Sequence, residues 1–270
     1  MLKIKTLLFA VSMIPFVLNA QNLLKNGDAE KNLETWENNQ IQISNANPHS
    51  GKNCFEMLGN WVTNSQIIAI DPLKSYKLSG WVKNTDTKKR TVYLSLMPLD
   101  ANKERIKCEN VNSIANTETE LAEACRAEDT VIKIKDANNW KFSENKLDLI
   151  AFNILNDYKD LPNFNISGGA VIKAEIKNTI WELTLDKACG KTYPAGTKVR
   201  QHQYASGFIY PVYQHEFNSA DWKELTGEIK GMSKFGAGGN QFWAGTKYVQ
   251  VIIGGMIYFD DIKFEEQKGF

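Results

Sequence analysis

One stretch of the sequence collects side chains that could perform acid–base chemistry. Residues 200–215, RQHQYASGFIYPVYQH, hold one arginine, two of the three histidines of the chain and three tyrosines. On an alternating strand Arg200, His202 and Tyr204 would share one face. A Tyr/His pair can remove the C5 proton of a uronic acid while an arginine neutralises its carboxylate, so the stretch is a candidate polysaccharide lyase site. The spacing equally suits a solvated sheet surface, which is the interpretation that we favour.

Aromatic side chains offer a second kind of chemistry, the stacking of sugar rings. The apolar C–H face of a pyranose packs against the electronegative face of an aromatic ring. Trp61 follows a short loop, Trp243 lies in the glycine-rich FGAGGNQFWAGT, and Trp81 opposes the apolar face of its strand. A single tryptophan is more often packed in a core. These three are nevertheless the predicted ligand-binding residues.

The elements that must position these side chains are strands. Apolar and polar residues alternate in short segments that are rich in β-branched and aromatic residues and bounded by turn formers. Examples are YKLSGWV (76–82), TVYLSLM (91–97), TIWELTL (179–185) and KYVQVII (247–253). Many short strands separated by turn residues are typical of a β-sandwich, so the predicted fold class is all-β.

The chain divides into an outer and an inner part. Residues 21–102 plus 216–270 carry strands of one kind of sandwich, and residues 103–215 carry a strand set of their own. We interpret 103–215 as a small β subdomain inserted into a loop of the sandwich. Insertions of this size are tolerated because the entropy cost of closing a loop grows slowly with its length.

Residues 1–20 are predicted to be a secretory signal peptide. Lys3 and Lys5 precede a short apolar run that ends in LNA, which is the order of charged, apolar and small residues that such signals have. Without these two lysines, 30 of the 32 Lys and Arg remain against 31 Asp and Glu, a net charge of −1. A net charge so close to zero gives no sign of the basic surface that binds nucleic acid or anionic lipid. We expect a secreted or periplasmic protein that is not inserted in a membrane.

Four cysteines remain: Cys54, Cys108, Cys125 and Cys189. An even number in an exported chain favours disulfides over thiol chemistry. Cys108 and Cys125 flank a polar segment and are the first expected pair, which leaves Cys54 with Cys189. Sequence does not separate the three possible pairings, and free buried thiols are the alternative.

Four segments together resemble a known family. Elements of bacterial cellulose- and xylan-binding modules are similar, in the same order, to NLLKNGDAEKNLETW (22–36), HSGKNCFEMLG (49–59), DPLKSYKLSGWVKNT (71–85) and GGMIYFDDIKFEE (254–266). The resemblance implies a galactose-binding-like jelly roll with two antiparallel sheets face to face. Ala29 stands where the family pattern has a phenylalanine, and segment 103–215 has no counterpart in the simple modules.

The resemblance also implies a structural calcium ion. Modules of this family commonly hold one where the first loop, the second loop and the last strand meet. The matching positions here are Asp28, Glu30, the backbone around Lys52, and Asp260 or Asp261. Calcium takes six to eight hard oxygen ligands, which carboxylates and carbonyls of a turn supply. Solvated edge charges are the alternative interpretation.

The predicted function is therefore non-catalytic binding of a polysaccharide or glycan by a calcium-stabilised, exported β-sandwich. The first alternative is a polysaccharide lyase that acts by β-elimination with Arg200, His202 and Tyr204. A further alternative is a structural or adhesive surface protein. The fold does not separate these functions, because this sandwich serves many.

Overall fold

The computed structural model describes residues 21–36, 39–142, 147–232, 236–237 and 239–267. The predicted signal peptide, residues 1–20, lies outside the described residues. All ladders between the named strands are antiparallel, and the helix α1 (Cys108–Val111) spans four residues. The predicted all-β class is confirmed.

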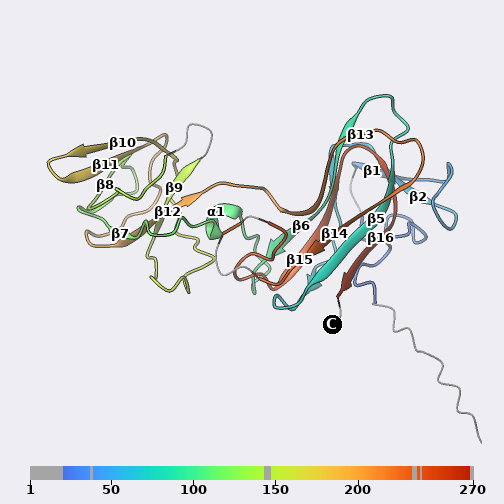
Figure 1. Ribbon diagram of the computed structural model, residues 1–270, viewed down its shortest axis with the longest axis horizontal. Coiled ribbons are helices and arrows are strands. Elements are labelled where there is room, and N and C mark those ends of the chain that lie inside the picture. Colours follow the sequence, from blue (N-terminus) through green and yellow to red (C-terminus); the bar gives the residue numbers. More distant parts are fainter. Residues whose placement is uncertain (1–20, 37–38, 143–146, 233–235, 238, 268–270) are drawn as a thin grey trace, which may run out of the picture.

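Two five-stranded sheets form the larger part of the molecule, on the right of Figure 1. The first has the order β1 (Ile41–Ser44), β2 (Cys54–Met57), β16 (Tyr258–Glu266), β5 (Tyr76–Lys83), β14 (Lys223–Ile229). The second has the order β13 (Ile209–Phe217), β6 (Arg90–Leu99), β15 (Tyr248–Gly254), β3 (Trp61–Thr63), with β4 (Ile68–Ala69) also paired to β15.

The sandwich core lies between these two sheets and is rich in aromatic rings. Trp36, Phe55 and Phe259 are fully buried, with ring centroids 4.8 to 5.5 Å apart. The indole N–H of Trp36 donates to the carbonyl of Asn26 at 3.0 Å. Trp36 thus fixes the first loop to the core, in which Ala29 of that loop is also buried.

A second core belongs to two three-stranded sheets, on the left of Figure 1. One sheet has the order β10 (Val171–Lys177), β11 (Ile180–Leu185), β8 (Val131–Ile134), and the other has β7 (Thr119–Glu120), β12 (Lys198–Gln203), β9 (Asp148–Phe152). Phe152 stacks on Tyr193 in this core, with ring centroids 4.0 Å apart. The buried residues of the second core run from Leu121 to Val199.

The segments that join the two parts pack with the sandwich. Ile106, Cys108 and Val111, in and before α1, belong to the sandwich core. Strand β13 pairs with β6 from Ile209 onward. The second core is therefore shorter than the predicted insert 103–215, because both ends of that segment contribute to the sandwich.

The predicted disulfide pairings are wrong, and the four cysteines are buried free thiols. Cys108 belongs to the sandwich core, whereas Cys125 and Cys189 belong to the second core. Cys54 lies on β2 of the first sheet, in the other part of the molecule from Cys189. The Cys125 thiol contacts that of Cys189, and burial together with this neighbour raises the pKa of Cys125. The error arises because closeness in sequence does not report closeness across a fold.

Across the described residues, none of the helices has the length and apolar character needed to cross a membrane.

Candidate carbohydrate-binding surface

The outer face of the second sheet follows from strict alternation. Val92, Leu94 and Leu96 of β6 are fully buried and point into the sandwich. The residues between them therefore point outward, and the same holds for β15, where Val249, Val251 and Ile253 are the inward set. Tyr93 on β6 and Gly254 on β15 consequently face away from the core.

Strand register places four residues of this outer face in one row. Trp61 pairs with Gly254, Gly254 pairs with Tyr93, and Tyr93 pairs with Tyr213. The row crosses β3, β15, β6 and β13. Directly opposed residues of antiparallel strands project from the same face. We call these four residues the aromatic row.

Gly254 is needed for the geometry of the row. A Cβ atom there would lie 2.0 Å from Cζ of Tyr93. The Tyr93 ring therefore lies across β15, over the glycine and toward the Trp61 side. Any side chain at this position would displace the ring.

Three tyrosines and a histidine form a cluster at the β13 end of the row. Tyr93 and Tyr213 lie nearly parallel with centroids 6.1 Å apart, and Tyr210 meets both edge-on at 5.4 and 5.5 Å. The ring of His215 lies 4.9 Å from that of Tyr213. Burial raises the pKa of Tyr210 to about 12 and also raises the pKa of Tyr93. Both hydroxyls stay protonated at neutral pH and can donate to sugar oxygens.

Trp61 closes the other end of the row beside a cavity. Its side chain is 53% exposed. The cavity has a volume of about 430 Å³ and is lined by Gln40, Asn60, Trp61 and Thr63. An exposed indole among amide and hydroxyl groups combines a stacking surface with hydrogen-bonding groups, which is what a sugar requires. Trp61 thus has the exposure that its predicted ligand-binding role needs.

Neither Trp243 nor Trp81 presents the free ring that a ligand-binding residue needs, although both were predicted to bind the ligand. Trp243 is buried in the sandwich core, so its predicted ligand-binding role is corrected. Trp81 points outward from the first sheet, but His49 stacks on it with centroids 3.9 Å apart and an interplanar angle of 14°. His49 in turn meets Trp222 edge-on. One face of Trp81 is therefore occupied by the protein itself.

The residues predicted to bind calcium hold the loop at 49–53 through hydrogen bonds. Glu30 Oε1 accepts the backbone N–H groups of Lys52 and Asn53 at 2.8 and 2.9 Å. Buried Asp260 accepts those of His49 and Ser50 through Oδ2. Burial raises the pKa of Asp260 to about 6.

Two further acidic residues complete this region. Asp261 accepts from Nδ1 of His49 at 2.7 Å and from the Ser50 hydroxyl at 3.0 Å. Asp28 and Asp261 both line a small cavity of about 150 Å³. Within the described ranges, no group of three or more His, Cys, Asp or Glu side chains is placed to hold a metal ion. Oxygen atoms of Glu30, Asp260 and Asp261 thus already accept hydrogen bonds from the protein, and the calcium ion stays a prediction.

A buried lysine that sequence analysis missed holds the segment just before this loop. Lys83 is 3% exposed, and its ammonium donates to the carbonyls of Ala46 and Asn47 at 3.1 and 2.6 Å. It also lies 4.5 Å from the ring centroid of Trp222 and 5.1 Å from that of Tyr258. The first sheet thus uses its outer aromatic residues to surround an internal cation.

The candidate lyase residues do not form an open site. Arg200 and His202 are fully buried, and Arg200 Nε donates to His202 Nε2 at 3.2 Å. The Nδ1 atom of His202 lies 2.7 Å from the carbonyl of Glu109, to which it donates, so the ring is neutral. Burial lowers the pKa of His202 to about 4. Arg200 also pairs with Asp160 at 2.9 Å. Arg200 and His202 are thus inaccessible to a polysaccharide, so the predicted grouping of these two residues with Tyr204 in one open site is wrong.

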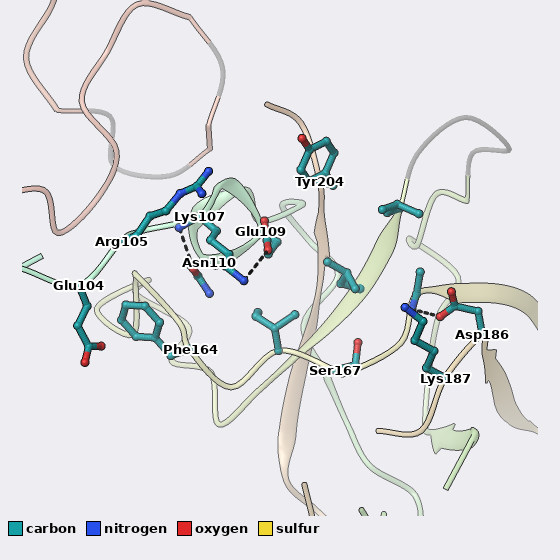
Figure 2. A pocket seen from close by; sticks show the side chains of 15 residues that line it. Glu104, Arg105, Lys107, Glu109, Asn110, Phe164, Ser167, Asp186, Lys187 and Tyr204 are labelled. Atoms are coloured by element: carbon teal, nitrogen blue, oxygen red, sulfur yellow. Dashed lines mark hydrogen bonds and ion pairs between the residues drawn. The ribbon is translucent and has the colours of Figure 1, made fainter. Parts of the chain in front are cut away.

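Tyr204, the third candidate, lies on an open cavity between the two parts of the molecule. Figure 2 shows this junction cavity, whose volume is about 570 Å³. Tyr204 and Phe164 on its wall are 46% and 44% exposed. Charged residues of both signs surround them: Glu104, Arg105, Lys107, Glu109, Asp186 and Lys187.

Comparison with known proteins supports a binding role for the first part of the chain. Residues 21–124 match the model of a family described as "Carbohydrate binding domain". The predicted resemblance to a carbohydrate-binding module is thereby confirmed for these residues, which include Trp61 and Tyr93.

A similar solved structure is the CBM22-1 xylan-binding domain of Xyn10C from Paenibacillus barcinonensis. It shares 8% sequence identity at a TM-score of 0.36, over 93% of this chain and 97% of that chain. The comparison with curated proteins gave no match.

Proposed function

We propose that this protein binds a polysaccharide or glycan non-covalently on the outer face of the β13-β6-β15-β3 sheet. The observation that carries the proposal is the aromatic row, in which Trp61, Tyr93 and Tyr213 face outward on three strands with Gly254 between them. The carbohydrate-binding family matched by residues 21–124 supports the same function.

The dimensions and chemistry of the row suit a sugar chain. Neighbouring strands lie about 4.8 Å apart, so a row over four strands spans about 14 Å. This length accommodates more than one pyranose ring. Exposed Trp61 and Tyr213 offer ring faces for stacking at its two ends, and the protonated tyrosine hydroxyls offer hydrogen bonds. Two anchors at a fixed separation favour a chain over a single sugar.

The proposal is for binding without catalysis. A β-elimination site needs its base and its arginine to reach the same uronic acid residue. Arg200 and His202 are fully buried and already bonded to each other, whereas Tyr204 is exposed on the junction cavity. Incubation with alginate or polygalacturonate should give no rise in the ultraviolet absorbance of unsaturated uronate products.

The proposal includes export and a calcium ion. The order of charged, apolar and small residues in 1–20 favours export followed by signal cleavage. For calcium, Asp28 and Glu30 would supply carboxylate oxygens and the neighbouring turn would supply carbonyls. A chelator should lower the melting temperature of the purified protein, and added calcium should restore it. An unchanged melting temperature would remove calcium from the proposal.

A glycan array followed by calorimetry tests the binding function. We expect the full-length mature protein to bind a defined set of polysaccharides, and Tyr213→Ala to weaken that binding at least tenfold. The matched control is Leu73→Ala, which removes an exposed large apolar side chain outside the row. Equal affinity of wild type and Tyr213→Ala would contradict the proposed site.

A further inference from the structure

Aromatic contacts continue beyond the end of the row toward the second core. The edge of Phe208 meets Tyr210 with centroids 5.9 Å apart. The guanidinium carbon of Arg105 lies 4.9 Å from the ring centroid of Phe208. Arg105 Nη2 also donates to the carbonyl of Gly207 at 2.9 Å. Arg105 is therefore held in place on the segment that leads into β13.

Arg105 belongs to two surfaces at once. It stacks on Phe208, which touches the tyrosine cluster, and it lines the junction cavity (Figure 2). Tyr210 is a second link. Burial raises the pKa of Tyr210 to about 12, the nearby Tyr93 and Tyr204 raise it as well, and Arg105 lowers it. The hydroxyl oxygen of Tyr210 lies 3.7 Å from the position of a Cβ at Gly207. The Tyr210 side chain thus reaches back to Gly207, whose carbonyl accepts the hydrogen bond from the cavity-lining Arg105.

The junction cavity has the properties of a ligand site. Its volume of about 570 Å³ lies within the usual range for small-molecule sites, which occur preferentially at domain interfaces. One wall comes from residues 104–110 on the sandwich side, and the other from residues 147–170 and 186–187 of the second part. Phe164 and Tyr204 expose nearly half of their surface there. Aromatic walls with polar groups between them are suited to a sugar.

The charged groups of the cavity leave donors for a hydroxyl-rich ligand. Asp186 is engaged by the backbone N–H of Ala170 at 2.7 Å, and Glu109 lies 3.9 Å from the ammonium of Lys107. Lys187 makes no side-chain hydrogen bond or ion pair within the described part of the chain. The cavity therefore keeps at least one cationic donor that the protein does not use itself.

We propose that the carbohydrate-binding surface extends from the aromatic row, over Phe208 and Arg105, into the junction cavity. This inference rests on the proposed function. It assigns the ligand class as a long polysaccharide, bound along an interior stretch of its chain by the sandwich and the second part together. The part of the molecule around the second core would then supply one wall of the binding site, and the sandwich would supply the rest.

The experiment compares ligand length with variant position. The probes are cellulose, xylan and polygalacturonate fragments from disaccharides to octasaccharides, titrated calorimetrically into the full-length mature protein. The variants are the Phe164→Ala/Tyr204→Ala double variant in the cavity and Tyr213→Ala in the row, with Leu73→Ala as control. Circular dichroism and melting temperature establish that each variant is folded. Exposed Phe164 and Tyr204 are expected to be replaceable without loss of the fold.

We expect the cavity variant to lose at least tenfold affinity for the longest bound fragments and none for the shortest. Tyr213→Ala should weaken the binding of both. If the cavity variant binds long fragments as tightly as wild type while Tyr213→Ala does not, the extension is overturned and the proposed function stands. If Tyr213→Ala binds every fragment as wild type does, or wild type binds none of them, the proposed function and the extension fail together.

Discussion

The two outer faces of the sandwich carry similar aromatic residues in opposite situations. On the first sheet, Trp81 is stacked by His49, and Trp222 and Tyr258 lie around the Lys83 ammonium. On the second sheet, Trp61 and Tyr213 each expose about half of their side chain. On the first face a ring or an ammonium of the protein covers each of these aromatic residues, whereas on the second face Tyr213 keeps half of its surface open to solvent although it contacts Tyr93, Tyr210 and His215. Exposed ring surface, rather than the number of aromatic residues, identifies a binding face.

The same distinction separates the charged residues near the junction. Arg200 is fully buried between His202, Asp160 and the ring of Tyr158. Arg105 lines the junction cavity, and its guanidinium contacts the ring of Phe208 and donates to the carbonyl of Gly207. The first arginine is part of the structure's interior, and the second is available to a ligand.

The largest expected effect is the loss of stability caused by a substitution on the outer face of the first sheet. Lys83→Met should lower the free energy of unfolding by about 3 kcal/mol, because it removes two charged hydrogen bonds, leaving the Ala46 carbonyl without a donor and the Asn47 carbonyl with the Trp222 indole N–H alone. Urea unfolding measures this change. Lys77→Met, on the same strand, is the control and should cost far less. Glycan affinity per folded molecule should not change, and a loss of affinity would contradict the separation of the two faces.

The buried histidine makes stability depend on pH. The pKa of His202 is lowered to about 4 in the folded protein, from an ordinary value of 6.5, so the unfolded chain binds the proton more readily. Its contribution is complete above pH 6.5 and is lost as the pH falls toward 4. From pH 7 to pH 5 the loss should be about 2 kcal/mol.

The histidine effect must be measured as a difference between proteins. Asp260, whose pKa is raised to about 6, acts in the opposite direction, since its contribution is lost as the pH rises through that value. Urea unfolding of wild type and His202→Gln at both pH values isolates the histidine. If the two proteins show equal pH dependence, His202 is not the buried neutral group described above.

Paired substitutions on the two faces should have opposite consequences. Tyr213→Ala should cost at least tenfold in affinity, or about 1.4 kcal/mol, with little change in melting temperature. Trp222→Ala should lower the melting temperature and leave affinity unchanged, because its ring contacts Lys83 and its indole N–H donates to the Asn47 carbonyl. Calorimetry and thermal unfolding of both variants provide the comparison. Affinity lost in Trp222→Ala and kept in Tyr213→Ala would exchange the roles of the two faces.

A smaller effect is expected from the glycine in the row. Gly254→Ala should displace the Tyr93 ring and weaken glycan binding a few-fold. The double variant with Tyr93→Ala should bind about as well as Tyr93→Ala alone, since residues in contact are not additive. Full additivity of the two affinity losses would show that Gly254 does not act through Tyr93.

Sequence alone predicts the strands well but the binding site poorly. The alternation in TVYLSLM identifies a strand and places Tyr93 opposite Val92 and Leu94. It does not reveal that Tyr93 lies between Gly254 and Tyr213, because register between strands far apart in sequence is set by the whole fold. Trp61 could be selected for its loop position, whereas Trp243, in an equally loop-like context, is buried.

The spacing of Arg200 and His202 illustrates the same limit for chemical motifs. Their alternation correctly brings the two side chains together on β12. Burial by residues far away, including Asp160 and the Glu109 carbonyl, then removes them from any substrate. Residue spacing predicts proximity, but accessibility depends on what the rest of the chain packs against the pair.

A crystal structure of the mature protein with a bound polysaccharide fragment tests the central claim most directly. We predict sugar rings stacked on Trp61 and Tyr213, with the chain continuing past Phe208 toward Phe164. Sugar bound instead against Trp81 and Trp222 on the first sheet, with the aromatic row empty, would contradict the account.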